Sequence, residues 1–513
     1  MSKALSKAKT RRQTVTDLER EVASLKHQLE WFQRQLFGRK SEKRQAEDIP
    51  EQPLLNGFDV DAPEPQETPT ETVSYTRRKR RGDDCVNDSG LRFDASVPVQ
   101  VIQQSAPELS GPDADEYEVI SEKVTYRLAQ RTSAYVVLKY VRPVLKHRTS
   151  AKLSSTPAPP ALWDNDIADV SVVAGLLVDK FVYHLPLYRQ HQRMGRDGIT
   201  LSRETLTNWV HRAIPLLEPV YRAQLRHILQ SKVLCIDETP VKAGRNKSGS
   251  MSIGWYWPIY GQDDEVAFTF SPSRGHQHLV DTLQGFSGTL LSDGYSAYTA
   301  YVRRCNDVEH AQCWVHLRRE FVRAEKAEPQ AVNQAYDLIG ALYRIESDIK
   351  QHALTGESKQ AYRQSHSTPA VDAFFAWCKE QSHRMDLAPS EPLSKALKYA
   401  MKREHALRVF LHNSDVAIDT NHLERTLRVI PMGRKAWLFC WTEIGAKRVG
   451  IIQSLLTTCR IHGINPSTYL IDVLQRVSTH PNERIEELTP RLWKNLYGDD
   501  PLRSDLDSIT TCQ

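Results

Sequence analysis

The spacing of hydrophobic positions changes several times along the chain. Between residues 18 and 36, apolar side chains recur at alternating intervals of four and three, at Leu18, Val22, Leu25, Leu29, Phe32 and Leu36. This heptad spacing predicts a coiled-coil helix within residues 1–44. A helix packed against its own domain would show the same stripe, but residues 45–75 are acidic and rich in proline and offer no adjacent core. We therefore predict a homo-oligomer formed through this helix, followed by a disordered linker over residues 45–84.

Short runs with a two-residue period follow the linker. Residues 119–126 and 135–141 have the alternation of strands, so residues 85–160 are predicted to form a small β-rich module. The period becomes helical over residues 161–230, first at 167–194 and, after Gly198, in the segment TLSRETLTNWVHR. A helix, a glycine turn and a second helix capped by Ser202 are typical of a helix-turn-helix DNA-binding region.

The second helix of this region has an apolar side and a polar side. Leu201, Leu206 and Val210 are predicted to point inward. Four side chains on the outer face are candidates for contacts to base edges or phosphates: Arg203, Thr207, Asn208 and His211. A pair of amphipathic helices inside a core gives a similar pattern, so the pattern alone leaves both interpretations open.

A strand period returns after residue 230. The pattern predicts helices at about 275–283 and 297–303 and five strands, at 233–236, 253–260, 266–270, 289–291 and 308–313. This is the element order of a ribonuclease-H-like domain, with a mixed five-stranded sheet and flanking helices. Right-handed crossovers place the fourth strand parallel to and beside the first, so Asp237 and Asp293, which follow these strands, become neighbours. Two carboxylates in one cleft repel each other, and divalent cations relieve that repulsion.

A third acid is expected from a helix packed on the same sheet. The segment NHLERTLRVI at 421–430 supplies Glu424 on a helix whose buried stripe is Leu423, Leu427 and Ile430. Taken alone, each acid has an ordinary structural explanation: a salt bridge from Glu424 to Arg428, a turn cap at Asp237 and a common loop dipeptide at Asp293-Gly294. Their joint occurrence at the positions that this fold requires favours a catalytic site.

The distance between two of these acids implies an insertion. Glu424 lies 131 positions after Asp293, far more than one strand and one helix require. Residues 328–405 have a helical pattern and are predicted to divide the catalytic domain into residues 231–327 and 406–480. Residues 481–513 are predicted to form a C-terminal tail, and the expected fold class is multidomain α+β.

The composition indicates where in the cell the protein is found more than what activity it has. Of the 513 residues, 26% are charged and 40% hydrophobic, with a formal net charge of +5. No apolar run is long enough to cross a bilayer, and the eight cysteines lack the paired spacing of a disulfide framework. We therefore expect a cytoplasmic protein without membrane contact. Residues 1–50 and the block RRKRR at 77–81 are basic, which suits either DNA phosphate binding or solvated tails.

Several long segments give the sequence a family resemblance. They are QLFGRKSEKR, HLPLYRQ, LSRETLTNWV, IDETP, LLSDGYSAY, HAQCWVHLRREF, NHLERTLRVIPMGRKAWLF and SLLTTCRIHGINPSTYL. Over most of its length the chain resembles the large subunit, transposase C, of the bacterial insertion-sequence-sixty-six family. The resemblance implies that Asp237, Asp293 and Glu424 are the catalytic and metal-binding Asp-Asp-Glu set.

The resemblance also implies an activity and its partners. The chain would be a nucleoid-associated DNA transposase that binds the ends of an insertion sequence, cuts their 3′ ends and joins them to target DNA. Its cofactors would be two Mg²⁺ or Mn²⁺ ions, and its partners double-stranded DNA and two small companion proteins encoded by the same element. Two alternatives are a ribonuclease-H-like nuclease without joining activity and a catalytically silent DNA-binding derivative of a transposase.

The sequence departs from the family pattern in two places. Family members usually carry paired zinc-binding cysteines after the linker, whereas Cys85 is the only cysteine before Cys235 here. We therefore predict a degenerate zinc-finger-like module without structural zinc. Ala436 stands where the family usually has asparagine, so an asparagine side chain at this position is not essential if the protein is active.

More candidate residues cluster after the fifth strand and after the Glu424 helix. Cys313 and His316, with His310 nearby, form half of a zinc site, but no second pair accompanies them. Trp314 is predicted to be a core residue rather than a platform for an unpaired base. The predicted phosphate contacts are Arg318, Arg319, Arg434 and Lys435.

Overall fold

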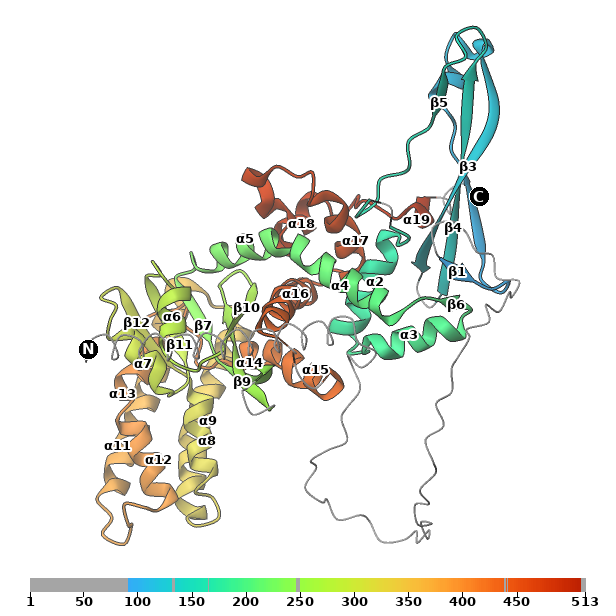
Figure 1. Ribbon diagram of the computed structural model, residues 1–513. Coiled ribbons are helices and arrows are strands. Elements are labelled where there is room, and N and C mark those ends of the chain that lie inside the picture. Colours follow the sequence, from blue (N-terminus) through green and yellow to red (C-terminus); the bar gives the residue numbers. More distant parts are fainter. Residues whose placement is uncertain are drawn as a thin grey trace, which may run out of the picture. The chain divides into compact units, whose positions relative to one another are not determined.

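A computed structural model gives the structure of the chain (Figure 1) and describes residues 91–131, 134–164, 166–245, 250–437, 440 and 442–508. Contacts divide the chain into two units, Met1–Cys85 and Val86–Gln513, and the described residues all belong to the second. The coiled coil, the linker and the basic block predicted for residues 1–84 lie outside the described residues. None of the described helices is long and apolar enough to span a membrane.

A small β-sheet module comes first. Its four-stranded sheet has the order β2-β4-β3, with β5 also paired to β4, and consists of β2 (Val99–Gln103), β3 (Tyr117–Arg131), β4 (Ala134–His147) and β5 (Leu153–Ser155). The two strands predicted at 119–126 and 135–141 lie within β3 and β4. Leu128, Val137 and Leu138 are fully buried where the β3–β4 hairpin meets the rest of the unit, whereas Val119 and Ile120 are exposed. Two 3₁₀ turns, η1 (Pro107–Ser110) and η2 (Ala114–Glu116), connect β2 to β3.

Four helices follow the module. They are α2 (Val170–Phe181), α3 (Leu187–Arg196), α4 (Arg203–Leu216) and α5 (Glu218–Ile228). The helix predicted over 167–194 is two helices, because His184 has a positive φ of 55° and Pro186 is the N-cap of α3. Ser202 accepts the Thr205 N–H and caps α4, as predicted.

The connection between α3 and α4 requires glycine. Gly198 has φ +80°, and a Cβ at this position would lie 2.4 Å from the Asp94 carboxylate. Two short strands, β1 (Arg92–Phe93) and β6 (Ile199–Thr200), pair beside this turn and tie the start of the described chain to it.

A mixed sheet occupies the middle of the unit. Its order is β10 (Val266–Ser271), β9 (Met251–Tyr260), β7 (Val233–Ile236), β11 (Gly288–Ser292) and β12 (Val308–Gln312). β7, β11 and β12 are parallel, and β9 is antiparallel to both β7 and β10. A sixth strand, β8 (Thr239–Arg245), pairs with β9 and was not predicted, because Pro240 and the charged residues around it interrupt the apolar pattern.

Both faces of this sheet are covered. Along β7, Leu234 and Ile236 belong to a core with α6 (Gln277–Thr282) and α7 (Ser296–Val302). Val233 and Cys235 point to the opposite core, to which α16 (Glu443–Ile461) contributes Ile452. Burial on both faces explains why the strand is a continuous apolar run.

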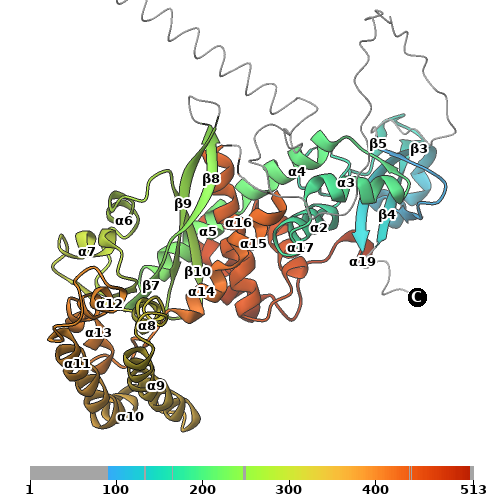
Figure 2. The ribbon, with the colours of Figure 1, turned by 90° about the horizontal axis from the view of Figure 1, so that it is seen from below.

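Helices make up the rest of the unit. A bundle lies to one side of the sheet in Figures 1 and 2 and contains α8 (Trp314–Val322), α9 (Pro329–Gln351), α10 (Gly356–Tyr362), the π-helical turn η3 (Arg363–Ser367), α11 (Thr368–Ser382), α12 (Pro392–Met401) and α13 (Glu404–Arg408). After the turn η4 (Val409–Leu411) come α14 (Asn421–Leu427), α15 (Val429–Trp437), α16, α17 (Pro466–Arg476), η5 (Asn482–Leu488), α18 (Pro490–Leu496) and α19 (Asp505–Ser508). All secondary-structure elements within the insertion predicted at 328–405 are helices or helical turns.

Residues 481–508 are a packed part of the unit, which differs from the predicted tail. Leu488 is fully buried, and Leu506 packs with Leu138 and Tyr140 of the β-sheet module. The Tyr140 hydroxyl donates to Asp505 at 2.6 Å. Apolar residues recur at helical intervals between 485 and 496, and the sequence analysis did not use this period.

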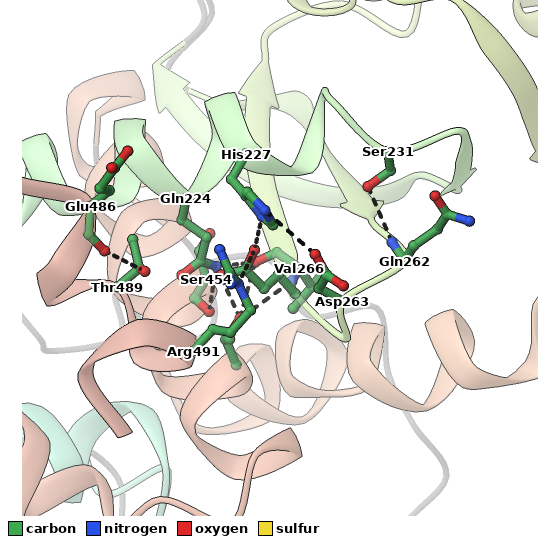
Figure 3. A network of polar contacts seen from close by, with 12 residues as sticks. Gln224, His227, Ser231, Gln262, Asp263, Val266, Ser454, Glu486, Thr489 and Arg491 are labelled. Carbon is green, nitrogen blue, oxygen red and sulfur yellow. Dashed lines mark hydrogen bonds and ion pairs between the residues drawn. The ribbon is translucent and has the colours of Figure 1, made fainter. Parts of the chain in front are cut away.

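A polar network joins the helical region to the sheet (Figure 3). Gln224 of α5 donates to the Val266 carbonyl of β10 at 2.8 Å and to Thr458 of α16 at 2.9 Å. His227 shares a 2.6 Å hydrogen bond with the buried Glu265, which also lies 3.5 Å from Arg491 of α18. The network therefore fixes α5, the sheet and the C-terminal helices to one another.

Candidate active site

Asp237 and Asp293 follow neighbouring parallel strands. β7 and β11 pair so that Leu291 lies opposite Cys235. The same offset, continued past the ends of the two strands, brings Asp293 level with Asp237. The backbone orients both carboxylates: Asp237 accepts the N–H of the next residue at 2.8 Å, and Asp293 accepts the N–H two residues later at 2.8 Å. The sheet thus brings these two predicted acids to one edge.

Cys313 fixes the helix that carries Glu424. Cys313 follows β12, and its Sγ accepts the Thr420 N–H at 3.3 Å and the Thr420 hydroxyl at 3.4 Å. Thr420 precedes α14, and its carbonyl accepts the Glu424 N–H at 2.9 Å. Burial raises the pKa of Cys313, so the sulfur stays a neutral thiol and acts as a hydrogen-bond acceptor. Glu424 is thereby held near the same edge of the sheet.

The three acids share an electrostatic environment. The pKa of Asp237 is raised to about 7, mainly by burial and also by the charges of Glu238, Asp293 and Glu424, against the lowering effect of the Glu238 N–H. Asp293 and Glu424 are therefore within electrostatic reach of Asp237. A cleft with this many carboxylates attracts cations, because each added positive charge relieves the repulsion.

Glu424 is paired with an arginine. Arg319 of α8 donates through Nη2 to both carboxylate oxygens, at 2.7 and 2.6 Å, and His316 lies 3.7 Å from the same group. The alternative pairing with Arg428 is not what the structure has. Among the described residues, no group of three or more His, Cys, Asp or Glu side chains stands close enough to hold a metal ion in this arrangement.

The helical insertion reaches the Asp293 turn. Arg403 donates to the Gly294 carbonyl at 3.0 Å, and its guanidinium stacks on Tyr399. A Cβ on Gly294 would lie 2.3 Å from the Tyr399 hydroxyl oxygen and 2.7 Å from the Arg403 Nε. A larger residue after Asp293 would therefore have to displace the Tyr399 and Arg403 side chains of the insertion.

Comparison with known proteins agrees with this architecture. The family model described as "Transposase IS66 family" matches residues 165–448, more than half of the chain. The chain belongs to the IS66 transposase family. Two further models match it: "IS66 C-terminal element" over residues 454–491, and "Transposase C of IS166 homeodomain" over residues 24–88, outside the described part. The resemblance inferred from the sequence is thereby confirmed.

Similar curated proteins come from Sinorhizobium fredii (strain NBRC 101917 / NGR234). The uncharacterized protein y4hP is 30% identical over 399 residues, which cover 73% of this chain and 71% of the relative. The uncharacterized protein y4jD is 30% identical over 360 residues, covering 66% and 68%, and y4qI is 29% identical over 390 residues, covering 72% and 71%. The similarity thus extends over most of this IS66 family member.

The helix-turn-helix candidates of this transposase differ in accessibility. Asn208 is exposed, whereas Arg203 is half-buried and lies over the Tyr188 ring. Thr207 donates its hydroxyl to the Arg203 carbonyl at 3.0 Å. His211 is half-buried, and burial lowers its pKa to about 4, so it is neutral at pH 7. Asn208 is therefore the most accessible of the four.

The candidates around the edge that carries Asp237 and Asp293 also differ in accessibility. Arg318 and Lys435 are exposed, Arg319 is paired with Glu424, and Arg434 donates to the Pro240 carbonyl. Trp314 is fully buried and donates to the Leu407 carbonyl at 2.9 Å, as expected for a core residue. His310 shares a 2.9 Å hydrogen bond with Ser292, so His310 and Cys313 each have a partner in the protein.

The sequence analysis missed one acid beside Asp237. The Glu238 side chain is only 2% exposed and pairs with Arg274, while Tyr298 donates to its other oxygen. Its position in the segment IDETP is the only signal for it in the sequence, and a glutamate beside a candidate catalytic aspartate has no distinguishing period. The arginine is 36 positions away, so spacing gives no indication of the pair.

Proposed function

We propose that this IS66 family member is a ribonuclease-H-like, Asp-Asp-Glu DNA transposase. It binds the ends of an insertion sequence, cuts their 3′ ends and transfers the freed 3′-OH to target DNA. The observation that carries the proposal is the level placement of Asp237 and Asp293 on parallel strands, with the Glu424 helix docked beside them. The strand order β10-β9-β7-β11-β12, with three parallel strands, supports the fold assignment.

The donor set suits hard divalent cations. Carboxylate oxygens are the ligands that Mg²⁺ and Mn²⁺ prefer, and Asp237, Asp293 and Glu424 would hold two such ions. When bound, the ions would lower the pKa of the attacking water and stabilise the leaving oxygen of an in-line displacement. Asp237 interacts electrostatically with each of the other two acids, because the charge of each raises its pKa.

Glu424 must exchange its partner before it can act as a ligand. Arg319 occupies both oxygens of Glu424. Its side chain is 49% exposed, so it can turn outward without disturbing the core. A DNA phosphate is a suitable new partner, since arginine binds phosphate and carboxylate with similar geometry. DNA binding and completion of the acidic site would then occur together.

The remaining parts of the chain have proposed roles in assembly. The α3–α4 pair would read DNA through Asn208 and neighbouring groups, and the segment before residue 45 would join copies of the chain. Two small companion proteins of the same element remain proposed partners, and association with the nucleoid follows from DNA binding. The β-sheet module is proposed to fold without zinc.

A joining assay tests the proposed function. Full-length protein is incubated with Mg²⁺, labelled pre-cut ends of the element that encodes it and a supercoiled plasmid. A transposase will produce linked end–plasmid products. A nuclease without joining activity will shorten the ends without linking them, and a catalytically silent derivative will only retard them in a gel. Either of the last two results rejects the proposal.

Asp237 also gives the site a pH signature. Because its pKa is about 7 in the folded protein, the folded state holds this proton more tightly than the unfolded state. Metal-free wild type should therefore lose stability relative to Asp237→Asn as the pH rises from about 4 to about 7. Above this pH range, adding Mg²⁺ should bring the stability of wild type relative to Asp237→Asn back toward its value at low pH. Thermal unfolding of both proteins measures this, and parallel pH profiles would contradict the shared acidic cleft.

A further inference from the structure

Arg274 lies against two aromatic rings beside the acidic edge. Its Cζ is 4.0 Å from the centroid of the Tyr295 ring and 4.6 Å from that of Trp255. The Tyr295 hydroxyl donates to the Arg274 carbonyl at 3.0 Å, which holds the ring against the loop. With two rings against it, the guanidinium is confined to one orientation and keeps its edges for hydrogen bonds.

A buried acid holds one edge of this guanidinium. Glu238 accepts from the Arg274 Nε at 3.0 Å and from Nη2, and Tyr298 donates to its other oxygen. Among the described residues, the Arg274 Nη1 group donates to no acceptor. The Arg274 side chain is 41% exposed, whereas that of Glu238 is 2% exposed. The arginine thus presents one charged edge to solvent from a fixed support.

This support stands directly beside the candidate catalytic carboxylates. Glu238 is the residue after Asp237, and Tyr295 is two residues after Asp293, whose charge also acts on Arg274. Glu238 is a fourth acid in this cleft and adds to the repulsion among the other three. Its pairing with Arg274 offsets this cost and also places the guanidinium. An oriented cation at such an edge suits a phosphodiester, which carries one negative charge and several acceptor oxygens.

We propose that Arg274 binds a phosphodiester of the DNA strand that enters the acidic site. Nη1 donates to a phosphate oxygen, and Glu238 and Tyr298 are positioning residues that keep the guanidinium in place. The inference rests on the proposed function, because it assumes that a DNA strand reaches this edge. It adds a strand-binding contact that is independent of the metal ligands.

Arg476 provides a matched control. It also stacks on an aromatic ring, with its Cζ 4.3 Å from the Tyr497 centroid, and it also pairs with a buried acid, Asp472. It lies on α17, however, and not at the edge of the sheet. Replacing either arginine by glutamine removes a ring contact and a pairing with a buried acid, and only the replacement of Arg274 is expected to affect strand binding.

The test measures binding of a short single strand. Full-length protein carrying Asp237→Asn is titrated in EDTA against fluorescein-labelled oligothymidylate of about eight nucleotides, at several salt concentrations. Adding Arg274→Gln should weaken binding about fivefold to tenfold and reduce the salt slope by about 0.7. Arg274→Lys should keep the slope with weaker binding, and Arg476→Gln should change neither quantity.

The outcomes separate this inference from the proposed function. Equal affinity and slope with and without Arg274→Gln overturn the inference, as does an equal loss in Arg476→Gln. Thermal unfolding checks that each variant is folded. If Arg274→Gln is unfolded, the binding affinity and salt slope of Arg274→Lys decide the question instead. Loss of strand binding in Arg274→Gln, together with failure of the joining assay, would retain the phosphate contact and reject the transposase reaction.

Discussion

Replacing Asp237 by Asn is expected to lower DNA cleavage and strand transfer by at least about a thousand-fold, equivalent to about 4 kcal/mol of transition-state stabilisation. The amide keeps the volume of the side chain and an oxygen that can accept the Glu238 N–H. It removes the negative charge of the acid whose pKa is raised by both Asp293 and Glu424. Binding of DNA ends, measured by gel retardation, should stay within about twofold of wild type, because the proposed DNA-reading helices α3 and α4 are untouched.

Two further variants sharpen this experiment. Glu424→Gln should cause a loss of similar size, since it removes the third proposed metal ligand while the helix stays docked through Cys313 and Thr420. Asp281→Asn is the matched control, because Asp281 is an exposed acid on the neighbouring helix α6. Cleavage that survives Asp237→Asn, or that falls equally in Asp281→Asn, would show that the acidic edge is not the catalytic centre.

The strands β7 and β9 to β12 of the mixed sheet could be predicted because both faces of this sheet are buried. The run at Val233–Ile236 is apolar at every position, and its two sides face different cores. That pattern is visible without any partner. β8 was missed because Pro240 and Lys242 interrupt its apolar pattern, although the strand pairs with β9 and buries Val241 and Ala243.

Two of the three acids of the candidate site could be predicted from strand order, and the third could not. Asp237 and Asp293 follow from strand order, since parallel neighbours must end at the same edge. Glu424 came from the family resemblance, and nothing in local spacing could show that Arg319 pairs with it from 105 positions away. The hydrogen bonds from Thr420 to Cys313 are equally remote in sequence, at a separation of 107. Contacts of this kind depend on how the insertion folds back, which periodicity does not encode.

The insertion also contains a charged residue whose role only the structure reveals. Arg363 lies in the π-helical turn η3 and is completely buried. Its sequence neighbourhood, RQSHS, is polar and would ordinarily be assigned to a surface. Burial of an arginine is tolerated only when its donors are satisfied, and the partners in this case are an acid 17 residues earlier and carbonyls of a segment about 50 residues later.

Arg363→Met is accordingly expected to destabilise the protein by about 3–5 kcal/mol. Arg363 donates to both oxygens of Glu346, at 2.7 and 2.8 Å, and to the carbonyls of Phe410 and Val416, each at 2.9 Å. Methionine fills part of the space but leaves the carboxylate and the carbonyls without these donors. The segment that loses its anchor leads directly to Thr420 and the Glu424 helix, so strand transfer should fall as well. Denaturant unfolding measures the stability change.

A comparison within the insertion isolates the effect of burial. Arg408 also pairs with two acids, Glu404 and Asp372, but its side chain is 24% exposed, so Arg408→Met should cost about 1 kcal/mol or less. The double variant Arg363→Met with Glu346→Gln should recover part of the loss, because it removes the uncompensated carboxylate while the backbone carbonyls remain unpaired. If Arg363→Met were no more costly than Arg408→Met, the buried arginine would not be what holds the insertion to the Glu424 helix.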